Sequence, residues 1–197
     1  MNKHSFQIIG VTGGMGSGKS YICKKLKELG YPIYEADAAA KEVMKLPNIT
    51  QQIQNEFGEE SYINGFLNTH YLSKVFSDKK KLQKLNAIVH PAVATHFENY
   101  LFNLSTSKSL VFKEAAILFE SGTWKSCDKI VTIFAPFGIR VNRILYRDPH
   151  LSLEQIYYRM NQQWSDEWKV KNSHFTIFND GFLNIDKQIQ NLLKLIS

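Results

Sequence analysis

One eight-residue stretch constrains the fold of this chain more than any other. Residues 13–20 read GGMGSGKS, which matches the spacing G-x-x-x-x-G-K-S. An apolar run at residues 7–12 precedes the stretch, and apolar side chains recur after it at helical spacing, at Ile22, Cys23, Leu26 and Leu29. This order predicts a strand, a glycine-rich turn and a helix, which is the context in which such a loop binds phosphate rather than merely joining two elements.

The residue types in this loop suit a nucleoside triphosphate. Glycines let backbone N–H groups curl around a phosphate because no Cβ stands in the way, and the N-terminus of a helix adds a positive dipole. Lys19 can reach the β- and γ-phosphates, and the Ser20 hydroxyl can ligate Mg²⁺. The sequence therefore predicts a nucleoside-triphosphate site.

Chain length and net charge limit the number of domains and the classes of partner that this protein can have. The 197 residues fit one domain with room for an inserted subdomain. The net charge of +6 could mark a nucleic-acid surface, but it also suits an enzyme whose substrates are polyanionic phosphates. The densest basic run, residues 79–81 with Lys84, lacks the interleaved aromatic side chains that stack bases. We expect a solvated helix face there and no nucleic-acid partner.

The sequence carries no sign of membrane insertion or export. No apolar run approaches the ~20 residues that a membrane span needs, and residues 1–5 lead directly into the first expected strand. We therefore expect no signal peptide, no membrane partner and a cytoplasmic location. Cys23 and Cys127 have no partner at metal-ligand spacing, so we expect both to be small buried residues.

The rest of the chain alternates between strand and helix patterns. Short apolar runs bounded by breakers predict further strands at residues 31–34, 110–112, 129–134 and 175–178. With residues 7–12 they predict an α/β fold, a five-stranded parallel sheet flanked by helices on both faces. Residues 38–104 are mostly helical in pattern, which is typical of an insert that grips a substrate. In its long helical segment from residue 79 to 104, Pro91 should interrupt and kink the helix near His90.

Several polar residues fall where the predicted strands end. Asp37 follows the second strand, where an acidic group can meet a substrate hydroxyl, or it can cap a helix that begins at Ala38; the two roles do not exclude each other. Glu114 and Glu120 follow the third strand and could touch metal or substrate, or simply pair with a lysine. No acidic helper for the metal stands out. His90 alone is more often a packed or capping residue than a functional one.

Arginines late in the chain suggest a lid over the phosphates. Arg140, Arg143 and Arg147 lie on a helix predicted for residues 139–147, and a second helix follows at Ser152. Planar guanidinium groups neutralise the charge that spreads onto a transferring phosphoryl group. For any single arginine, simple exposure to solvent is the alternative.

Taken in order, these features resemble the dephospho-coenzyme A kinase family over nearly the full length. The matching strings are the loop at residues 9–20, ADA at 36–38, LNAIVHP at 85–91, EAAILFE at 114–120, Arg143 with Arg147 and Asp148, Arg159 with Gln163, and IFNDG at 177–181. Many ATPases share the loop alone. The strings that contain His90-Pro91 and Leu118-Phe119-Glu120 are much more specific.

The resemblance implies an ATP-dependent enzyme that phosphorylates the ribose 3′-hydroxyl of dephospho-coenzyme A, giving coenzyme A and ADP. It implies a P-loop kinase fold of the three-layer α/β/α type. The single domain would comprise a core at about residues 1–37, 105–140 and 172–197, a helical coenzyme-A-binding insert at about 38–104, and a lid at about 141–171. A monomer or a small homo-oligomer is expected.

The family's roles carry over to matching positions. Asp37 would orient or deprotonate the 3′-hydroxyl, with Lys19 and Arg143 as the other catalytic residues, and Ser20 would ligate Mg²⁺. Asp37, His90, Pro91 and Glu114 would bind the substrate. The residues expected to contact ATP are Gly14, Met15, Gly16, Ser17, Gly18, Lys19, Ser20, Tyr21, Arg143 and Asn179.

Three departures from the family pattern stand out. Glu35 replaces a frequent aspartate, and Ala116 replaces a frequent proline. Residues 164–167 read WSDE where the family often has methionine-proline-arginine-glutamate, which leaves Arg147 or Arg159 as the second lid arginine. Two rival functions remain at this point: a kinase for another small alcohol, such as a nucleoside monophosphate or a sugar acid, and a P-loop switch or nucleic-acid-associated ATPase.

Overall fold

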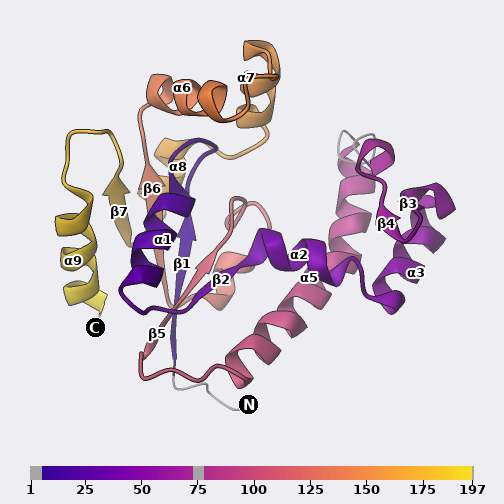
Figure 1. Cartoon of the computed structure of the whole chain (residues 1–197), viewed down its shortest axis with the longest axis horizontal. Helices are drawn as coiled ribbons and strands as arrows, with labels where there is room; N and C mark the ends of the chain where they lie inside the picture. The colour runs from indigo at the N-terminus through magenta and orange to yellow at the C-terminus, as the bar shows by residue number, and fades with distance from the viewer. Residues whose placement is uncertain (1–5, 73–77, 197) are drawn as a thin grey trace. The chain divides into compact units, whose positions relative to one another are not determined.

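The structure is a computed structural model that describes residues 6–72 and 78–196 (Figure 1). The expectation that residues 1–5 lead directly into a strand lies outside this described part. The chain divides into two compact units, which are treated separately below. One comprises Met1–Tyr34 with Thr106–Ser197, and the other comprises Glu35–Ser105.

The first unit is built on a five-stranded parallel sheet, as the sequence predicts. Its strands are β1 (Gln7–Thr12), β2 (Ile33–Glu35), β5 (Leu110–Glu114), β6 (Lys129–Phe134) and β7 (Phe175–Phe178), in the spatial order β2-β5-β1-β6-β7. The central strand β1 pairs with β5 and β6, which aligns Val11 with Glu114 and with Val131. The loop that follows β1 therefore leaves from the middle of the sheet's carboxyl edge, where ligands collect in such folds.

Two of the predicted strands, β2 and β5, have boundaries that differ from those observed. The second strand was expected at residues 31–34 but begins at Ile33, because the residues before it close the preceding helix, α1 (Lys19–Glu28). Gly30 adopts a left-handed φ of 83°, its N–H donates to Lys27 O, and the N–H of Tyr31 donates to Leu26 O. This helix-end motif uses the backbone of Tyr31 for the helix rather than for the sheet. The third strand, β5, extends two residues beyond its predicted end, to Glu114.

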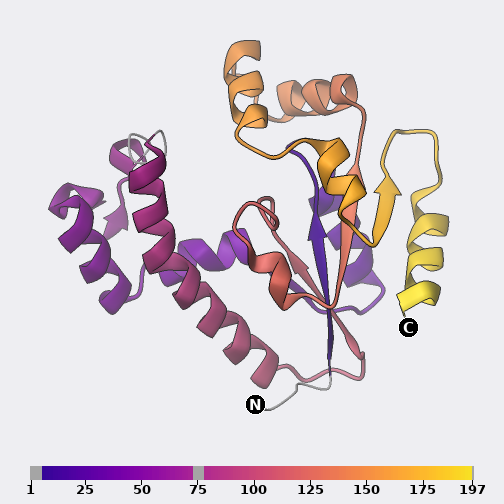
Figure 2. The same ribbon diagram turned by 180° about the vertical axis from the view of Figure 1, so that it is seen from behind.

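Helices cover both faces of the sheet. In Figures 1 and 2, α1 and α9 (Ile185–Ile196) lie on one face, and α8 (Asp166–Lys171) and the 3₁₀ turn η2 (Thr123–Ser126) lie on the other. The buried core on the α1 and α9 side comprises Ile9, Val11, Ile22, Cys23, Leu26, Leu110, Phe112, Val131, Ile133, Ile177, Ile189, Leu192 and Ile196. Burial of these side chains stabilises the platform from which the loop projects.

A second, smaller core joins α6 (Phe137–Arg147) to α7 (Leu153–Asn161). Its buried members are Val141, Ile144, Leu151, Ile156 and Met160. A capping box starts α7: the Ser152 hydroxyl accepts from Gln155 N, and the Gln155 side chain accepts from Ser152 N. Because the capping box involves only residues 152 and 155, the sequence alone is enough to predict the start of α7, and the structure confirms it.

The second unit, Glu35–Ser105, is mostly helical, as predicted. It contains α2 (Ala36–Val43), α3 (Pro47–Phe57), the 3₁₀ turn η1 (Glu59–Ser61), the hairpin of β3 (Tyr62–Ile63) and β4 (Phe66–Leu67), and α5 (Lys79–Phe102). Asn64 and Gly65 both have positive φ, as the tight turn of a hairpin requires. The predicted interruption at Pro91 is wrong, since α5 continues through this residue; the kink expected near His90 stays a prediction. Buried Val89 and Val93 on either side hold this part of α5 in the packed core of the unit.

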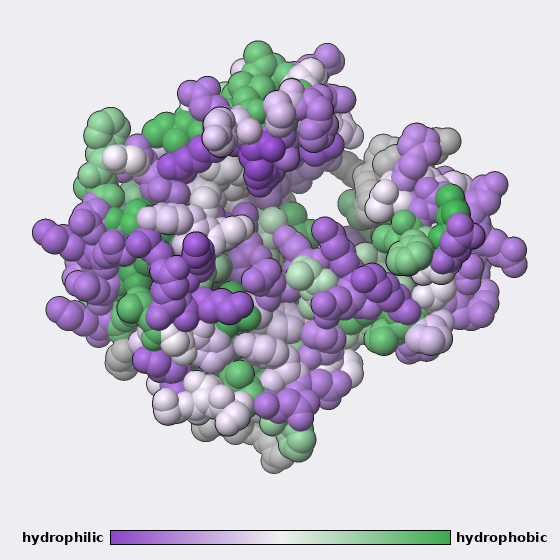
Figure 3. All heavy atoms as spheres, viewed as in Figure 1, coloured by the Kyte–Doolittle hydropathy of each residue, from purple (hydrophilic) through white to green (hydrophobic). Residues whose placement is uncertain are grey.

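The surface is largely hydrophilic in the view of Figure 3, with hydrophobic residues in separate patches. At the start of α5, Lys80, Lys81 and Lys84 are exposed, and Lys84 forms an ion pair with Glu56. Within residues 6–72 and 78–196, no helix has the length and apolar character needed to cross a bilayer.

Candidate active site

The glycine-rich loop connects β1 to α1, as predicted. Gly18 is the N-cap of α1 with a left-handed φ of 94°, and Lys19 and Ser20 form the first residues of the helix. Gly13 and Gly16 also have positive φ, of 151° and 81°. Only glycine adopts these values without strain, so the loop's shape follows directly from its composition.

Neighbouring atoms lie so close to the loop that a Cβ on any of its four glycines would clash, and at two of them the nearest atom belongs to a side chain. A Cβ on Gly14 would lie 1.8 Å from Nη1 of Arg140, and one on Gly18 would lie 2.1 Å from Nδ2 of Asn179. Asn179 is buried, and its Nδ2 donates to the carbonyl of Ser17 at 2.8 Å. The sequence placed Asn179 near ATP, and the structure places it directly against this loop.

Lys19 contacts both the loop and the neighbouring strand. Its Nζ donates to Gly13 O at 3.2 Å and lies 3.9 Å from Oε1 of Glu114. The register of the sheet explains the second contact, because Glu114 sits opposite Val11 at the end of β5. Of the roles considered for Glu114, pairing with a lysine is the one observed here. Its predicted part in substrate binding stays a prediction.

Arg143 lies on α6 and bonds to the loop and to Asn179. One guanidinium nitrogen donates to Ser17 O at 3.4 Å, and the other donates to Asn179 O at 3.1 Å and to Asn179 Oδ1 at 3.3 Å. A cavity of about 240 Å³ opens beside it, lined by Gly16, Gly18, Lys19, Ser20, Arg143, Ile144 and Arg147. The predicted lysine, serine and arginine thus share one cavity with a high density of donors.

Arg147 is the second arginine at this cavity. The sequence left the choice between Arg147 and Arg159 open, and Arg147 is among the residues that line the cavity. Its Nε and Nη2 both donate to Oδ2 of Asp148, and these bonds lower the pKa of the Asp148 carboxyl. Tyr21, also predicted to contact ATP, lies exposed on α1 with its ring 5.3 Å from Nζ of Lys25.

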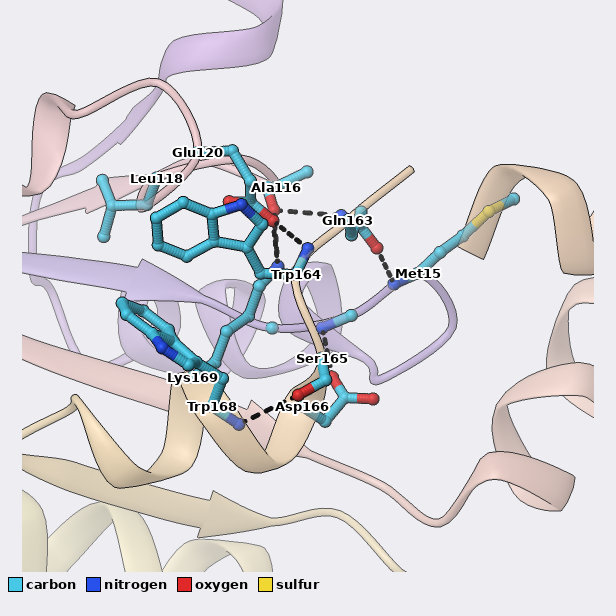
Figure 4. Close-up of polar contacts among 12 residues, drawn as sticks. Met15, Ala116, Leu118, Glu120, Gln163, Trp164, Ser165, Asp166, Trp168 and Lys169 are labelled. Carbon is cyan, nitrogen blue, oxygen red and sulfur yellow. Dashed lines mark hydrogen bonds and ion pairs between the residues drawn. The ribbon is translucent and has the colours of Figure 1, made fainter. Parts of the chain in front are cut away.

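Three polar residues lie against the first half of the loop, in contacts that the sequence did not predict. Asp166 Oδ1 accepts from the N–H of Gly14 at 3.2 Å, and Gln163 Oε1 accepts from the N–H of Met15 at 2.7 Å (Figure 4). Arg140 closes the group with an ion pair to Asp166 Oδ2 at 2.7 Å. Arg140 and Asp166 are buried, and burial raises the pKa of Asp166 despite the opposing effects of Arg140 and Lys169.

A buried lysine lies next to this group. The Lys169 side chain is fully buried, and its Nζ lies 2.8 Å from Oε1 of Glu120 and 3.4 Å from Ala116 O. Glu120 Oε1 also accepts from the N–H of Trp164 at 2.8 Å. Glu120 therefore pairs with a lysine, one of the two roles considered for it. No signal in the sequence identifies its partner, which lies far along the chain.

The remaining predicted residues belong to the unit Glu35–Ser105. The helix expected at Ala38 begins two residues earlier, so Asp37 lies in the first turn of α2 and Glu35 is the N-cap; the predicted capping role of Asp37 is wrong. His90 is half-buried on α5, and burial lowers its pKa. Pro91 lines a cavity of about 340 Å³ formed by residues of α2, α3 and α5. The catalytic role of Asp37 and the substrate contacts of His90 and Pro91 stay predictions.

The loop supplies the kind of protein ligand that a magnesium ion bound to a nucleotide needs. Mg²⁺ usually keeps several waters and takes only one or two protein oxygens besides substrate phosphates. Ser20, at the start of α1, lines the same cavity as Lys19, and its hydroxyl is one such oxygen. Within the described part of the chain, no group of three or more His, Cys, Asp or Glu side chains could hold a metal without a substrate.

The family model and the known relatives with similar sequences share one description. A family model for dephospho-CoA kinase matches residues 7–184. A dephospho-CoA kinase from Chlorobaculum tepidum is 36% identical over 202 residues, covering 96% of each chain, and one from Fusobacterium nucleatum is 34% identical, covering 98% of this chain and all of its own.

Solved structures share the fold, and one of them is a dephospho-CoA kinase. A Thermus thermophilus protein superposes with a TM-score of 0.87 at 32% identity over 98% of each chain. A dephospho-CoA kinase from Campylobacter jejuni gives 0.65 at 25% identity, covering 96% of this chain and 94% of its own. A shikimate kinase from Bacteroides thetaiotaomicron, at 14% identity and a TM-score of 0.56, shares the fold. By its sequence over nearly its whole length, this chain belongs to the dephospho-CoA kinase family.

Proposed function

We propose that this protein transfers the γ-phosphate of ATP to the ribose 3′-hydroxyl of dephospho-CoA, giving CoA and ADP in the last step of CoA synthesis. The observation that carries the proposal is the cavity shared by Lys19, Ser20 and Arg143 in a chain of this family. Phosphoryl transfer needs mostly positioning and charge neutralisation, and this cavity offers cations and helix N-terminal donors for both.

The ATP side of the mechanism rests on the loop. Backbone N–H groups of residues 16–20 and the N-terminus of α1 receive the phosphate oxygens. Lys19 moves from Glu114 towards the γ-phosphate, and Arg143 and Arg147 neutralise the charge that develops on the transferring group. Mg²⁺, bound by Ser20 and the phosphates, would supply further charge neutralisation.

The acceptor side rests on the helical unit. Asp37 accepts the proton of the 3′-hydroxyl while the hydroxyl oxygen attacks the γ-phosphorus. The β-phosphate oxygen of ADP leaves on the opposite side of the phosphoryl group. His90, Pro91 and Glu114 also take part in binding dephospho-CoA. Family membership supports these roles, because each residue falls within one of the strings that resemble the family.

The deciding experiment is a transfer assay with purified protein, ATP, MgCl₂ and dephospho-CoA. CoA is detected by mass, and phosphorus–proton coupling in NMR assigns the new phosphate to the ribose 3′-oxygen. Omission of MgCl₂ in the presence of EDTA should abolish product. A panel of AMP and shikimate tests the rival acceptors. Absence of CoA from protein that still binds ADP would show that the acceptor is wrong.

Two further properties are part of the proposal. We propose a cytoplasmic enzyme, which the two free cysteines support because cytoplasmic proteins keep their thiols reduced. We also propose a monomer or a small homo-oligomer, to be measured by light scattering coupled to size-exclusion chromatography.

A further inference from the structure

The side-chain amide of Gln163 links the loop to a second segment of the chain. Gln163 lies just after α7, and its Oε1 accepts from Met15 N at 2.7 Å. Its Nε2 donates to the carbonyl of Ala116, in the segment that follows β5, at 3.0 Å. Figure 4 shows the side chain lying between these two groups, with a dashed line to each. Both ends of the amide are thus used, which fixes its orientation.

The segment that carries Gln163 is itself held in place. The next residue, Trp164, donates its N–H to Glu120, and Lys169 pairs with Glu120 and bonds to Ala116 O. Glu120 and Ala116 both belong to the segment after β5. These contacts fix the backbone next to Gln163, so its side chain can hold Met15 in one place. A residue that positions a functional loop needs such support.

The contacts divide the loop into two halves. The N–H groups of Gly14 and Met15 donate to Asp166 and Gln163, whereas Gly16, Gly18, Lys19 and Ser20 line the cavity. Side chains from residues 163–166 accept from N–H groups of the first half, whereas Asn179 and Arg143 donate to the Ser17 carbonyl in the second half, which faces the cavity. The curvature of the second half therefore depends on the anchors of the first half as well as on its own.

We infer that Gln163 is a positioning residue for ATP: it holds Met15 so that residues 16–20 keep the curvature that receives the phosphates. This inference rests on the proposed use of the cavity for ATP. Loss of the amide leaves both Met15 N–H and Ala116 O without this partner, and the loop then gains alternative conformations that bind ATP poorly. A partly buried hydrogen bond lost in this way should weaken nucleotide binding about 10-fold.

The test compares Gln163→Met with Gln162→Met. Methionine matches the length of glutamine but removes both hydrogen-bonding ends, and Gln162 is the exposed preceding residue. The expected result for Gln163→Met is a dissociation constant for ADP, and a KM for ATP, raised about 10-fold. Its KM for dephospho-CoA and its melting temperature should stay close to those of the unmodified protein. Gln162→Met should leave all four quantities unchanged.

Hydrogen exchange of the Met15 amide reports on the contact itself. Exchange should be faster in Gln163→Met than in Gln162→Met. Gln163→Glu keeps an oxygen that can accept from Met15 but loses the donor to Ala116, so its Met15 amide should exchange slowly, as in the unmodified protein. Slow exchange in Gln163→Met, with unchanged ADP affinity, would overturn the inference. So would equal rises in both KM values with a lowered melting temperature, because they would indicate general destabilisation.

The outcome is separable from that of the proposed function. ADP binding and hydrogen exchange need no acceptor, so they test Gln163 even if the protein proves unable to phosphorylate dephospho-CoA. Conversely, if the enzyme is active and Gln163→Met leaves its ADP affinity unchanged, the proposed function is supported and the role inferred for Gln163 is refuted.

Discussion

The ammonium of Lys169 and the carboxylate of Glu120 form an ion pair of 2.8 Å in which the lysine side chain is fully buried. A charge removed from water needs a counter-charge, so each partner depends on the other. The pair joins α8 to the segment after β5, which also provides the Ala116 carbonyl for Gln163. The stability of this corner and the placement of the loop are therefore linked.

Glu120→Gln should destabilise the protein strongly, because it leaves the Lys169 ammonium buried without a counter-charge. The expected loss in the free energy of unfolding is about 3 to 5 kcal/mol, measured by urea denaturation. Glu28→Gln is the matched control, since Glu28 lies 4.0 Å from Lys24 in an exposed pair on α1, and should cost less than about 1 kcal/mol. Equal effects of the two changes would contradict the structural importance of the buried pair.

Lys19→Met should abolish most of the phosphoryl transfer. The variant loses the cation that reaches the β- and γ-phosphates, and turnover should fall by about 10²- to 10³-fold. Turnover is measured as CoA formed per enzyme, with Lys24→Met, an exposed lysine on the same helix, as the control. Near-normal turnover in Lys19→Met would refute the assignment of the loop.

Gly14→Ala should disrupt the loop through a clash rather than through lost flexibility. The new Cβ would stand 1.8 Å from Arg140 Nη1 and 2.5 Å from Asp166 Oδ1, so the buried ion pair must move. The expected cost is about 1 to 3 kcal/mol in the free energy of unfolding, with weakened ADP binding. Gly138→Ala serves as the control: a Cβ on Gly138, in α6, meets nothing within 4 Å, so stability should rise slightly.

Asp37→Asn should separate catalysis from nucleotide binding. If Asp37 takes the proton of the acceptor hydroxyl, turnover should fall about 10²- to 10⁴-fold while the ADP dissociation constant stays constant. Glu35→Gln, two residues earlier, is the control and should retain most of the activity. A collapse of ADP affinity in Asp37→Asn would instead point to a structural role.

The half-buried His90 should make stability fall in mild acid. Because burial lowers its pKa from the ordinary histidine value of 6.5, the unfolded chain binds a proton at higher pH than the folded protein does. The stabilisation is complete above the unfolded pKa of 6.5 and is lost as the pH falls through the folded pKa below it. Between pH 7.5 and 5.5 the melting temperature should therefore drop further for the unmodified protein than for His90→Gln. Parallel drops would exclude this contribution.

Local patterns predicted the sheet well because each buried strand is a short apolar run bounded by breakers. The limits of β1, β6 and β7 match their predictions, and the P-loop follows from its own eight residues. Where a predicted strand boundary was wrong, hydrogen bonds that the apolar pattern does not show determine the boundary. At Tyr31, for example, the N–H donates to Leu26 O at the end of α1. Pro91 is accommodated inside α5 because packing in the helical unit outweighs the local preference for a break.

The support of the loop could not be predicted in the same way. Gln163 and Met15 are 148 residues apart, and Asp166 and Gly14 are 152 apart, so only the folded chain joins them. Arg140 was counted among candidate lid arginines by its spacing, yet its partner Asp166 lies in the WSDE segment that departs from the family pattern. Periodicity identifies which face of a helix is polar, but not which distant side chain meets it.

The three tryptophans of the chain gather at the corner that contains Gln163. The rings of Trp164 and Trp168 lie 4.4 Å apart, and Phe119 lies 5.2 Å from Trp168 and 6.3 Å from Trp124. Indole emission from this protein is therefore a local signal: it arises beside the anchors of the P-loop, and the helical unit contributes none. A spectral change on addition of nucleotide would report on that corner in the native enzyme, without any attached dye.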